Sequence, residues 1–204
     1  MKKGIIFDLD GTLWDSSQAV VDAWNYALNG KYRFTLEEMQ SQMGKTMDDI
    51  AYTLFPNETK EEALRLMTMC TDYENEYIEK HGGNLYPHVR ETLEKLSQDY
   101  HLSIVSNCQE GYIEAFVNYY QLNALIKDTE NFGRTGKGKA DNIRLVVERN
   151  HLDKAVYVGD IEADYKSATE AGVPFIFAKY GFGHVENTPY IEKFSDLIEV
   201  VKAL

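Results

Sequence analysis

The chain has 204 residues, of which 44% are hydrophobic and 26% are charged, and its formal net charge is −12. This length allows one sizeable core, or a core with a small accessory domain, and the composition is ordinary for a globular protein. The acidic balance repels phosphate backbones, so nucleic-acid binding is not expected. A small phosphorylated substrate is compatible with this balance if a local cation attracts it.

The spacing of the cysteines and histidines and the length of the apolar runs exclude further classes of protein. Cys70 and Cys108 lack CxxC or Cys/His ligand spacing, and the five histidines are scattered, so neither a disulfide framework nor a structural zinc site is expected. No apolar run approaches the roughly 20 residues of a membrane span, and Asp8 and Asp10 interrupt any signal-peptide core. We therefore expect a cytoplasmic protein without membrane or nucleic-acid partners.

The first predicted element is a short buried strand over Gly4–Leu9. Its apolar residues lead directly into the segment Asp8-Leu9-Asp10-Gly11-Thr12. Because side chains alternate along a strand, Asp8 and Asp10 are expected to project to the same side. Two carboxylates so close repel each other unless a cation lies between them or one holds a proton. The segment therefore indicates metal-assisted chemistry more than a structural role.

Residues 16–82 show only helical patterns. An apolar stripe predicts a helix over residues 20–27. Two short helices are expected over 35–43 and 46–55, and a long one over 58–80. Gly82 and Gly83 end the long helix, as glycines do at a helix terminus. An insert placed just after the two aspartates can close over the strand end. We predict a helical cap over 16–82 and a catalytic core formed by 1–15 and 83–204.

Beyond the insert, strands alternate with amphipathic helices. Further buried strands are expected over Leu102–Ser106, Ala155–Gly159 and Val173–Ala178, with a weaker one near Ala124–Asp128. A last helix is expected through Ile191, Phe194, Leu197, Ile198 and Val201. This alternation predicts an α/β fold, a doubly wound parallel sheet covered by helices on both faces. The segment Tyr180–Gly183 could form a loop at the rim of the site, but a plain turn is the preferred interpretation.

In open parallel sheets, ligands bind beyond the carboxyl ends of the strands, and polar residues of this chain follow those ends. They are Asp8, Asp10 and Thr12, then Ser106 and Asn107, then Lys137 and Lys139, then Asp160 and Asp164. Each alone could be a helix cap, a turn former or a solvated charge. Together they suit phosphoryl transfer to an aspartate, because a divalent ion and a lysine can cancel the repulsion between anions. Oxygen ligands favour Mg²⁺.

Four segments resemble the motifs of the haloacid dehalogenase-like superfamily. They are Asp8–Leu13, the apolar run into Ser106-Asn107, a lysine before a helix, and Gly159–Asp164. The helical insert and Tyr86-Pro87 resemble the phosphoglycolate phosphatase-like and β-phosphoglucomutase-like branch. The resemblance implies a Rossmann-like core with an inserted α-helical cap, and a phosphoric monoester hydrolase.

The resemblance also implies catalytic roles. Asp8 would be the nucleophile that forms an aspartyl-phosphate. Asp10 would be the general acid that protonates the leaving group, and then the base that activates water. Ser106 would bind the transferring phosphoryl group, helped by Gly11, Thr12 and Asn107. For Asp10 to hold a proton near neutral pH, its pKa must be raised by charged neighbours or by the exclusion of water, which a closing cap would supply.

A metal ion and a lysine complete the implied site. Mg²⁺ would be held by Asp8, the backbone carbonyl of Asp10 and Asp160, with Asp164 supporting it directly or through water. The lysine would balance the charges of Asp8 and the phosphate. Lys139 fits the family pattern of a lysine followed by a small residue and an acidic one, so we choose it. Lys137 stays open as the alternative.

The cap segment with Gly44 and Lys45 lies where this branch often places a substrate-reading loop. Gly44 permits a close backbone approach, and Lys45 could meet an anionic substrate, although a plain turn with a solvated lysine is an equal alternative.

The predicted reaction is Mg²⁺-dependent hydrolysis of a small phosphate monoester, phosphoglycolate-like or a sugar or nucleotide phosphate, by a monomer. A phosphomutase of the β-phosphoglucomutase type is the first alternative, and a non-catalytic binding or regulatory domain is the second. Hydrolytic dehalogenation does not use the second aspartate, so Asp10 disfavours it.

Overall fold

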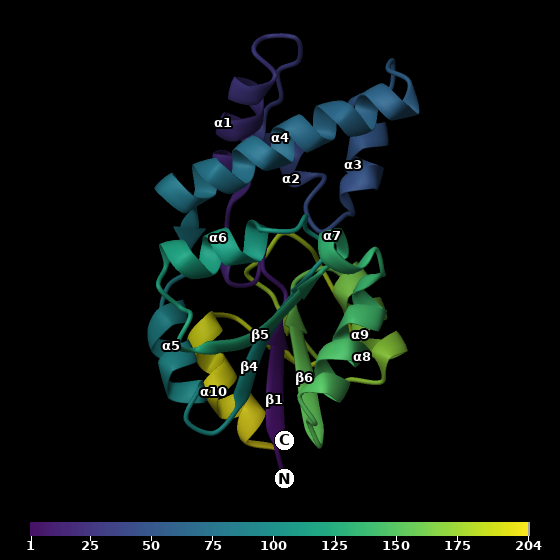
Figure 1. The fold of residues 1–204 in the computed structure, drawn as a ribbon. Coiled ribbons are helices and arrows are strands. Elements are labelled where there is room, and N and C mark those ends of the chain that lie inside the picture. The colour runs from purple at the N-terminus through teal and green to yellow at the C-terminus, as the bar shows by residue number, and fades with distance from the viewer. Residues whose placement is uncertain (204) are drawn as a thin grey trace.

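A six-stranded parallel sheet forms the centre of the computed structural model, which describes residues 1–203 (Figure 1). Its strands are β1 (Lys3–Phe7), β4 (His101–Ser106), β5 (Ile126–Asn131), β6 (Lys154–Gly159), β7 (Phe175–Ala178) and β8 (Tyr190–Ile191). They follow the order β5-β4-β1-β6-β7-β8, and each neighbouring pair is parallel. The predicted doubly wound parallel sheet is thus confirmed, with β1 between β4 and β6.

Helices cover both faces of the sheet because its central strands are apolar on both sides. Ile5 and Phe7 of β1 belong to one hydrophobic cluster, and Ile6 belongs to another. The first cluster includes α5 (Val89–Leu96), α6 (Tyr112–Tyr119) and α10 (Leu197–Val200), and the second includes α8 (Lys139–Arg149) and α9 (Glu162–Ala171). Each fully buried Ile or Phe contributes about 1.5–3 kcal/mol, so β1 is held firmly at the centre.

The remaining short helices also lie outside residues 16–82. They are α7 (Phe132–Thr135) and two 3₁₀ helices, Phe194–Asp196 and Val201–Ala203.

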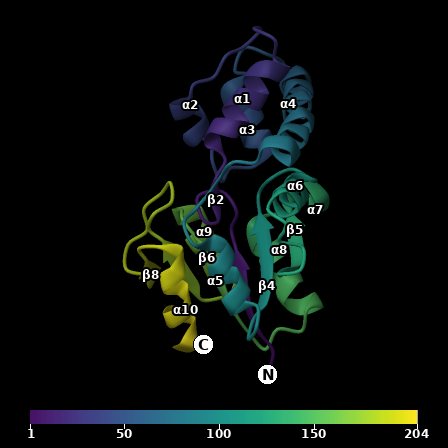
Figure 2. The ribbon, with the colours of Figure 1, turned by 90° about the vertical axis from the view of Figure 1, so that its left-hand side faces the viewer.

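Four helices between residues 17 and 81 stand above the carboxyl edge of the sheet (Figures 1 and 2). They are α1 (Ser17–Ala27), α2 (Leu36–Gln40), α3 (Met47–Leu54) and α4 (Lys60–His81). The hydroxyls of Thr35, Thr46 and Thr59 accept hydrogen bonds from backbone N–H groups in the first turns of α2, α3 and α4, which satisfies donors that a helix start leaves unpaired. The helices predicted for this segment are therefore present, and we call residues 16–82 the helical insert.

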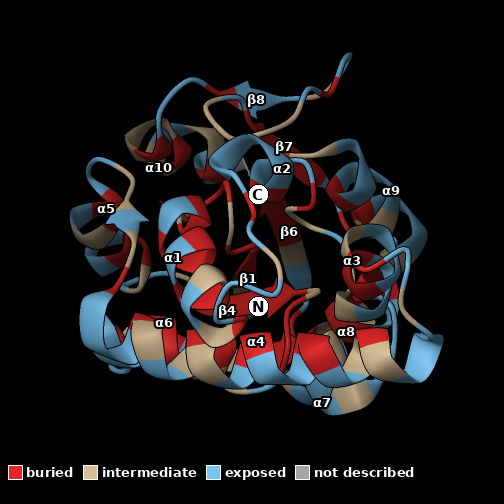
Figure 3. Cartoon of the chain, turned by 90° about the horizontal axis from the view of Figure 1, so that it is seen from above, coloured by how far each residue is buried: buried red, intermediate tan, exposed pale blue. Residues whose placement is uncertain are grey.

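The helical insert has a hydrophobic cluster of its own, which includes Trp24, Met67 and Cys70. Buried and exposed residues alternate along α4, as in an amphipathic helix (Figure 3). Within residues 1–203, no helix, α4 included, is both long enough and apolar enough to cross a membrane.

Two short strands connect the helical insert to the sheet. The chain leaves the core through β2 (Trp14–Asp15) and returns through β3 (Asn84–Leu85). These strands pair antiparallel, with Asp15 opposite Asn84, and Figure 2 shows the two connections between the upper and lower parts of the molecule. The sequence prediction did not include this pair, because two residues carry too little pattern to indicate a strand.

The structure corrects three predicted boundaries. β1 ends at Phe7 and not at Leu9, and the fifth strand spans 126–131 instead of 124–128. Ile191 belongs to the edge strand β8, and only short helical turns follow it, so the predicted last helix is wrong in its length. Apolar spacing does not show where hydrogen-bonded pairing begins or ends, which explains these differences.

Candidate active site

Three adjacent strands bring the predicted site residues to one edge. β1 lies between β4 and β6, and Phe7 pairs with Ile104 on one side and Val158 on the other. Asp8 follows β1 directly, Ser106 is the last residue of β4, and Asp160 follows β6. The carboxyl ends of neighbouring parallel strands therefore place these three side chains close together.

Lys139 lies between two carboxylates at this edge. It is the first residue of α8 and only 4% exposed. Its Nζ lies 2.9 Å from Asp8 Oδ1 and donates a hydrogen bond of 2.5 Å to Asp164 Oδ1. Burial acts to lower the pKa of Lys139, but the charges of Asp164 and Asp8 outweigh it and hold that pKa above its ordinary value. Lys139 is therefore a buried cation.

Lys137, the alternative lysine, is exposed. Its backbone N–H donates to Thr135 Oγ1, and its carbonyl accepts from Asn142 Nδ2. Lys137 thus serves the turn before α8 through its backbone, whereas the Lys139 side chain reaches Asp8. The geometry supports Lys139 as the lysine of the site.

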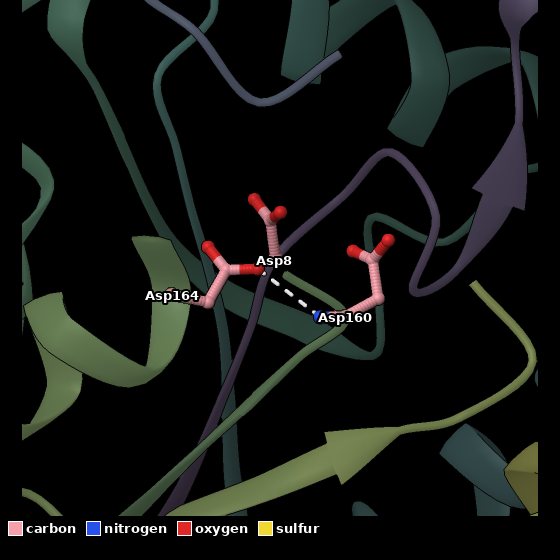
Figure 4. Close-up of side chains that lie close together, drawn as sticks. All are labelled: Asp8, Asp160 and Asp164. Atoms are coloured by element: carbon pink, nitrogen blue, oxygen red, sulfur yellow. Dashed lines mark hydrogen bonds between the residues drawn. The ribbon is translucent and has the colours of Figure 1, made fainter. Parts of the chain in front are cut away.

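Asp8, Asp160 and Asp164 form a buried cluster of carboxylates (Figure 4). One ligand oxygen from each lies within 4.8 Å of the others. Burial, then the charge of Asp164, raise the pKa of Asp8 to about 7 against the lowering effect of Lys139. Burial and the charges of Asp164 and Asp8 also raise the pKa of Asp160 well above its usual range. The site therefore holds more negative charge than Lys139 balances.

Backbone and side-chain donors hold these carboxylates in place. Asp164 Oδ2 accepts from the N–H groups of Asp160 at 3.1 Å and Ile161 at 3.2 Å, the first of which Figure 4 shows as a dashed line. Thr12 Oγ1 donates to Asp160 Oδ1 at 3.2 Å. The side chain of Thr12, predicted to help bind phosphate, thus contacts the carboxylate of Asp160.

The segment Tyr180–Gly183 forms part of the site, which corrects its interpretation as a plain turn. The N–H of Phe182 donates to Asp160 Oδ2 at 2.8 Å, and Tyr180 Oη donates to the carbonyl of Thr12 at 2.8 Å. A Cβ on Gly181 would lie 2.3 Å from Asp160 Cβ. Gly181 is therefore required for the close approach of this loop to Asp160.

Gly11 lies against Asp160 from the opposite loop. Its φ is +78°, and a Cβ there would lie 2.1 Å from Asp160 Oδ2. Its N–H donates to the carbonyl of Trp14 at 2.9 Å, so this amide, predicted to contact phosphate, already has a partner. Gly11 leaves room for the Asp160 carboxylate.

The donor set of this cluster fits Mg²⁺. All the side-chain donors are carboxylate oxygens, which are the ligands that this cation prefers. Asp8 Oδ1 is buried, and the described residues offer it the ion pair with Lys139 at 2.9 Å. A divalent cation would also relieve the repulsion that raises the pKa values of Asp8 and Asp160.

The Asp10 carboxylate lies outside the cluster of Asp8, Asp160 and Asp164, so the two aspartates of the first motif do not converge on a single point. Its Oδ1 accepts hydrogen bonds from Trp14 Nε1 at 3.0 Å, Ser16 Oγ at 2.6 Å and Tyr112 Oη at 2.9 Å. The predicted contribution of Asp10 to a metal was its backbone carbonyl, and this stays a prediction.

Burial raises the pKa of Asp10, and the donors on Oδ1 oppose that effect only in part. Because all three of these hydrogen bonds end on Oδ1, Oδ2 is the oxygen available to carry a proton. Asp10 has thus the properties of a general acid. Sequence reasoning missed Tyr112, whose only signal is a hydroxyl next to the apolar face of its helix.

The loop between α2 and α3 brings the helical insert against the core. Asn107 Nδ2 donates to the carbonyl of Gly44 at 3.0 Å. Gly44 has a φ of +81°, and a Cβ there would lie 2.4 Å from Ile161 Cδ1. Lys45 is exposed, and its Nζ donates to Gln42 Oε1 at 2.9 Å. The predicted close approach of Gly44 is present, and its neighbours are Asn107 and Ile161.

A cavity of about 40 Å³ lies between the helical insert and the carboxyl edge of the sheet. The core contributes Asp8, Asp10, Ser106, Asn107, Cys108, Gln109 and Tyr112 to its lining. The helical insert contributes Gly44, Lys45 and Glu74, along with mostly apolar side chains. Candidate catalytic residues of the core and side chains of the helical insert therefore line one narrow cavity.

Residues 5–178 match the family model described as haloacid dehalogenase-like hydrolase. The chain belongs to this family. The resemblance predicted from its motifs is confirmed, and the match covers every site residue predicted from the sequence, but not the loop Tyr180–Gly183.

Members of this family with similar sequences include phosphoglycolate phosphatases. That of Aliivibrio fischeri is 29% identical, over 90% of this chain and 87% of its own, and that of Rhodobacter capsulatus is 27% identical, over 96% and 94%. The crystal structure of a predicted phosphoglycolate phosphatase from Haemophilus somnus superposes with a TM-score of 0.86 at 21% identity, over 98% of both chains. The last comparison confirms the fold, and the first two support a phosphatase-like hydrolase.

Proposed function

We propose that this protein is a Mg²⁺-dependent phosphatase that hydrolyses a small phosphate monoester through an aspartyl-phosphate on Asp8. The observation that carries this proposal is the buried Lys139 between Asp8 and Asp164, because an ammonium beside a carboxylate allows that carboxylate to approach a phosphate. The named activity of the relatives supports the same class of reaction. The helical insert would be the cap, and the predicted monomer stays a prediction.

In the first step, an oxygen of Asp8 attacks phosphorus, and the bond between phosphorus and the leaving-group oxygen breaks. Asp10 gives its proton to that oxygen, so the leaving group departs as an alcohol. In the second step, a water oxygen attacks phosphorus while Asp10, now a carboxylate, takes the proton from this water. The bond between phosphorus and Asp8 breaks, and inorganic phosphate and a free Asp8 result.

The other residues bind the phosphoryl group and reduce the repulsion between it and Asp8 during these steps. Ser106 and Asn107 line the cavity beside Asp8 and would bind the phosphoryl oxygens. Lys139 screens Asp8 from the phosphate. Mg²⁺, held by Asp8, Asp160 and the Asp10 carbonyl with Asp164 in support, would add positive charge at the same place.

The nucleophile is tested by the substitution Asp8→Asn, which keeps the shape of the side chain. Without a carboxylate no acyl phosphate forms, so we expect turnover to fall by about 10³-fold or more. Phosphate release from p-nitrophenyl phosphate and from a panel of phosphorylated metabolites, with Mg²⁺ present, measures this. Turnover by Asp8→Asn within a few-fold of wild type would contradict the mechanism, and isomerised hexose phosphate without free phosphate would indicate a mutase.

The lysine assignment is tested by a matched pair. Lys139→Ala removes the buried cation that contacts Asp8, and we expect a loss of about 10²-fold or more in kcat. Lys137→Ala removes an exposed side chain two residues away and should leave kcat within about twofold. The same phosphate-release assay measures both variants. If Lys137→Ala alone abolished turnover, Lys137 would be the active-site lysine.

A further inference from the structure

The helical insert presents a largely apolar wall to the cavity. The side chains that form this wall are Val20, Trp24, Met39, Met43, Met47 and Ile50. They lie opposite the core residues proposed to bind the phosphoryl group, so this wall faces the position of the leaving group. An apolar wall favours the carbon skeleton of a leaving group and offers no compensation to a charge.

Glu74 is the acidic side chain that the helical insert adds to this cavity. It lies on α4, and only 3% of it is exposed. Trp24 Nε1 donates to Glu74 Oε2, and Gln109 Nε2 donates to Glu74 Oε1 at 3.3 Å. The carboxyl is therefore fixed from the insert side and from the core side, and it remains part of the cavity lining.

Glu74 also lies within electrostatic reach of the proposed acid. The charge of Asp10 contributes to raising the pKa of Glu74, although burial is the larger cause. Tyr112, which donates to Asp10, is in turn affected by the charges of both Asp10 and Glu74. Asp10 and Glu74 also line the same cavity, so a leaving group whose oxygen meets Asp10 shares that cavity with Glu74.

The cavity has no buried cation to receive a second anion. Among the described residues that line it, Lys45 is the cationic one, and it is exposed and donates to Gln42. The neighbouring Lys139 is already engaged by Asp8 and Asp164. A carboxylate on the leaving group would lose its hydration in this cavity and would oppose the ionisation of Asp8 that the reaction requires, which is unfavourable.

A hydroxyl or ammonium group on the leaving group can instead interact favourably with this cavity. It can donate a hydrogen bond to the Glu74 carboxyl, and an ammonium would also favour the ionised form of that carboxyl, whose pKa burial raises to about 8. We propose that Glu74 is a specificity-determining residue, and that the enzyme prefers phosphate monoesters whose leaving group carries a hydroxyl or an ammonium over those that carry a second anion. This inference rests on the proposed phosphatase function.

Three esters of equal length test the preference. They are 2-hydroxyethyl phosphate, ethanolamine phosphate and phosphoglycolate, which differ in the group that ends a two-carbon leaving group. For wild type with Mg²⁺, we expect kcat/KM for the hydroxyl or the ammonium ester to exceed that for phosphoglycolate by about tenfold or more. A kcat/KM for phosphoglycolate equal to or above both of the others would overturn the inference.

Two variants on α4 assign the preference to Glu74. Glu74→Gln removes the acid but keeps a polar side chain, and we expect the ratio of kcat/KM between the hydroxyl ester and phosphoglycolate to fall by about fivefold or more. Glu76→Gln changes an exposed acid on the same helix and should keep the wild-type ratio. Because this readout is a ratio within one protein, a loss of folded protein does not change it. An unchanged ratio in Glu74→Gln would overturn the role of Glu74.

The controls separate this inference from the function on which it rests. Wild type that releases phosphate from p-nitrophenyl phosphate but prefers phosphoglycolate retains the phosphatase proposal and loses the inference. Wild type that releases no phosphate from any ester contradicts the phosphatase proposal itself, and the inference with it.

Discussion

Glu74 is an ionisable side chain whose burial affects stability as well as the cavity. Burial raises its pKa from 4.5 to about 8, and the donors Trp24 and Gln109 lower it only in part. Between these pH values the folded protein binds a proton that the unfolded chain has released, so this residue reduces the free energy of unfolding as the pH rises. Relative to wild type, Glu74→Gln should therefore gain up to about 1.4 kcal/mol per pH unit between about pH 5 and 8.

Urea unfolding of both proteins at several pH values in this window measures that difference. The other groups that face Glu74, namely Asp10, Tyr112 and Cys70, are present in both proteins and cancel in the comparison. Glu76→Gln, with an exposed side chain, should show a difference that does not depend on pH. A constant difference between wild type and Glu74→Gln across the window would show that Glu74 titrates normally.

At the level of single residues, the sequence predicted the site residues that lie in motifs at the ends of neighbouring strands. It did not predict single side chains that contact the site from a distant element. Asp8, Ser106 and Asp160 end neighbouring strands, so strand order alone brings them together. Tyr112 reaches Asp10 from a distant helix, and no local pattern indicates that contact. Glu74 did leave a signal, because it lies four residues after Cys70 on the inward stripe of α4, where an acid is unusual.

At the scale of elements, the loop between α2 and α3 can be tested through two glycines. Gly44 and Gly30 both have a φ of +81°, but a Cβ on Gly44 would meet Ile161, while nothing lies within 4 Å of one on Gly30. Gly30→Ala should cost about 1 kcal/mol of stability, from its backbone conformation alone. Gly44→Ala should cost up to about 2 kcal/mol, because the end of the Ile161 side chain must also shift.

Activity distinguishes the same two substitutions. Gly44 lines the cavity, so its displacement should lower kcat/KM for p-nitrophenyl phosphate by about tenfold, whereas Gly30→Ala should leave kcat/KM unchanged. Thermal unfolding and the phosphate-release assay measure the two effects. Equal losses in both variants would show that the contact between the loop and Ile161 does not matter.

Most helices and strands could be predicted, because the apolar periodicity of a long segment identifies it as either a helix or a strand. The four main strands and the helices of the insert follow from apolar spacing, and β1 is apolar on both faces, as a central parallel strand must be. The short pair β2 and β3 and the edge strand β8 were missed, since two residues have no measurable period. The loop Tyr180–Gly183 was misjudged because its contact with Asp160 is tertiary.

At the scale of the whole molecule, a cation that binds only the folded state should stabilise the protein. Asp8 and Asp160 repel Asp164 and each other in the native structure, and these contacts are lost on unfolding. Mg²⁺ at about 100 times its Kd should therefore add about 2.7 kcal/mol to the free energy of unfolding. EDTA should reverse this gain and abolish turnover.

Asp160→Asn provides the control for this prediction. It removes one buried carboxylate of the cluster and leaves the acidic surface unchanged. We expect the melting temperature of this variant to be insensitive to Mg²⁺, and to be no lower than that of wild type in EDTA, because one source of repulsion is gone. A full Mg²⁺ response in Asp160→Asn would place the ion elsewhere on this acidic chain.

The pairing of Asp15 with Asn84 has a consequence for engineering. The chain departs from the sheet and rejoins it at adjacent points, and neither crossing supplies a strand to the six-stranded sheet. Any foreign segment whose two ends meet can therefore be grafted there while every pairing of the sheet is kept. Such a chimaera would exchange the helical wall of the cavity as a unit and would keep Asp8, Lys139, Asp160 and Asp164 of the core.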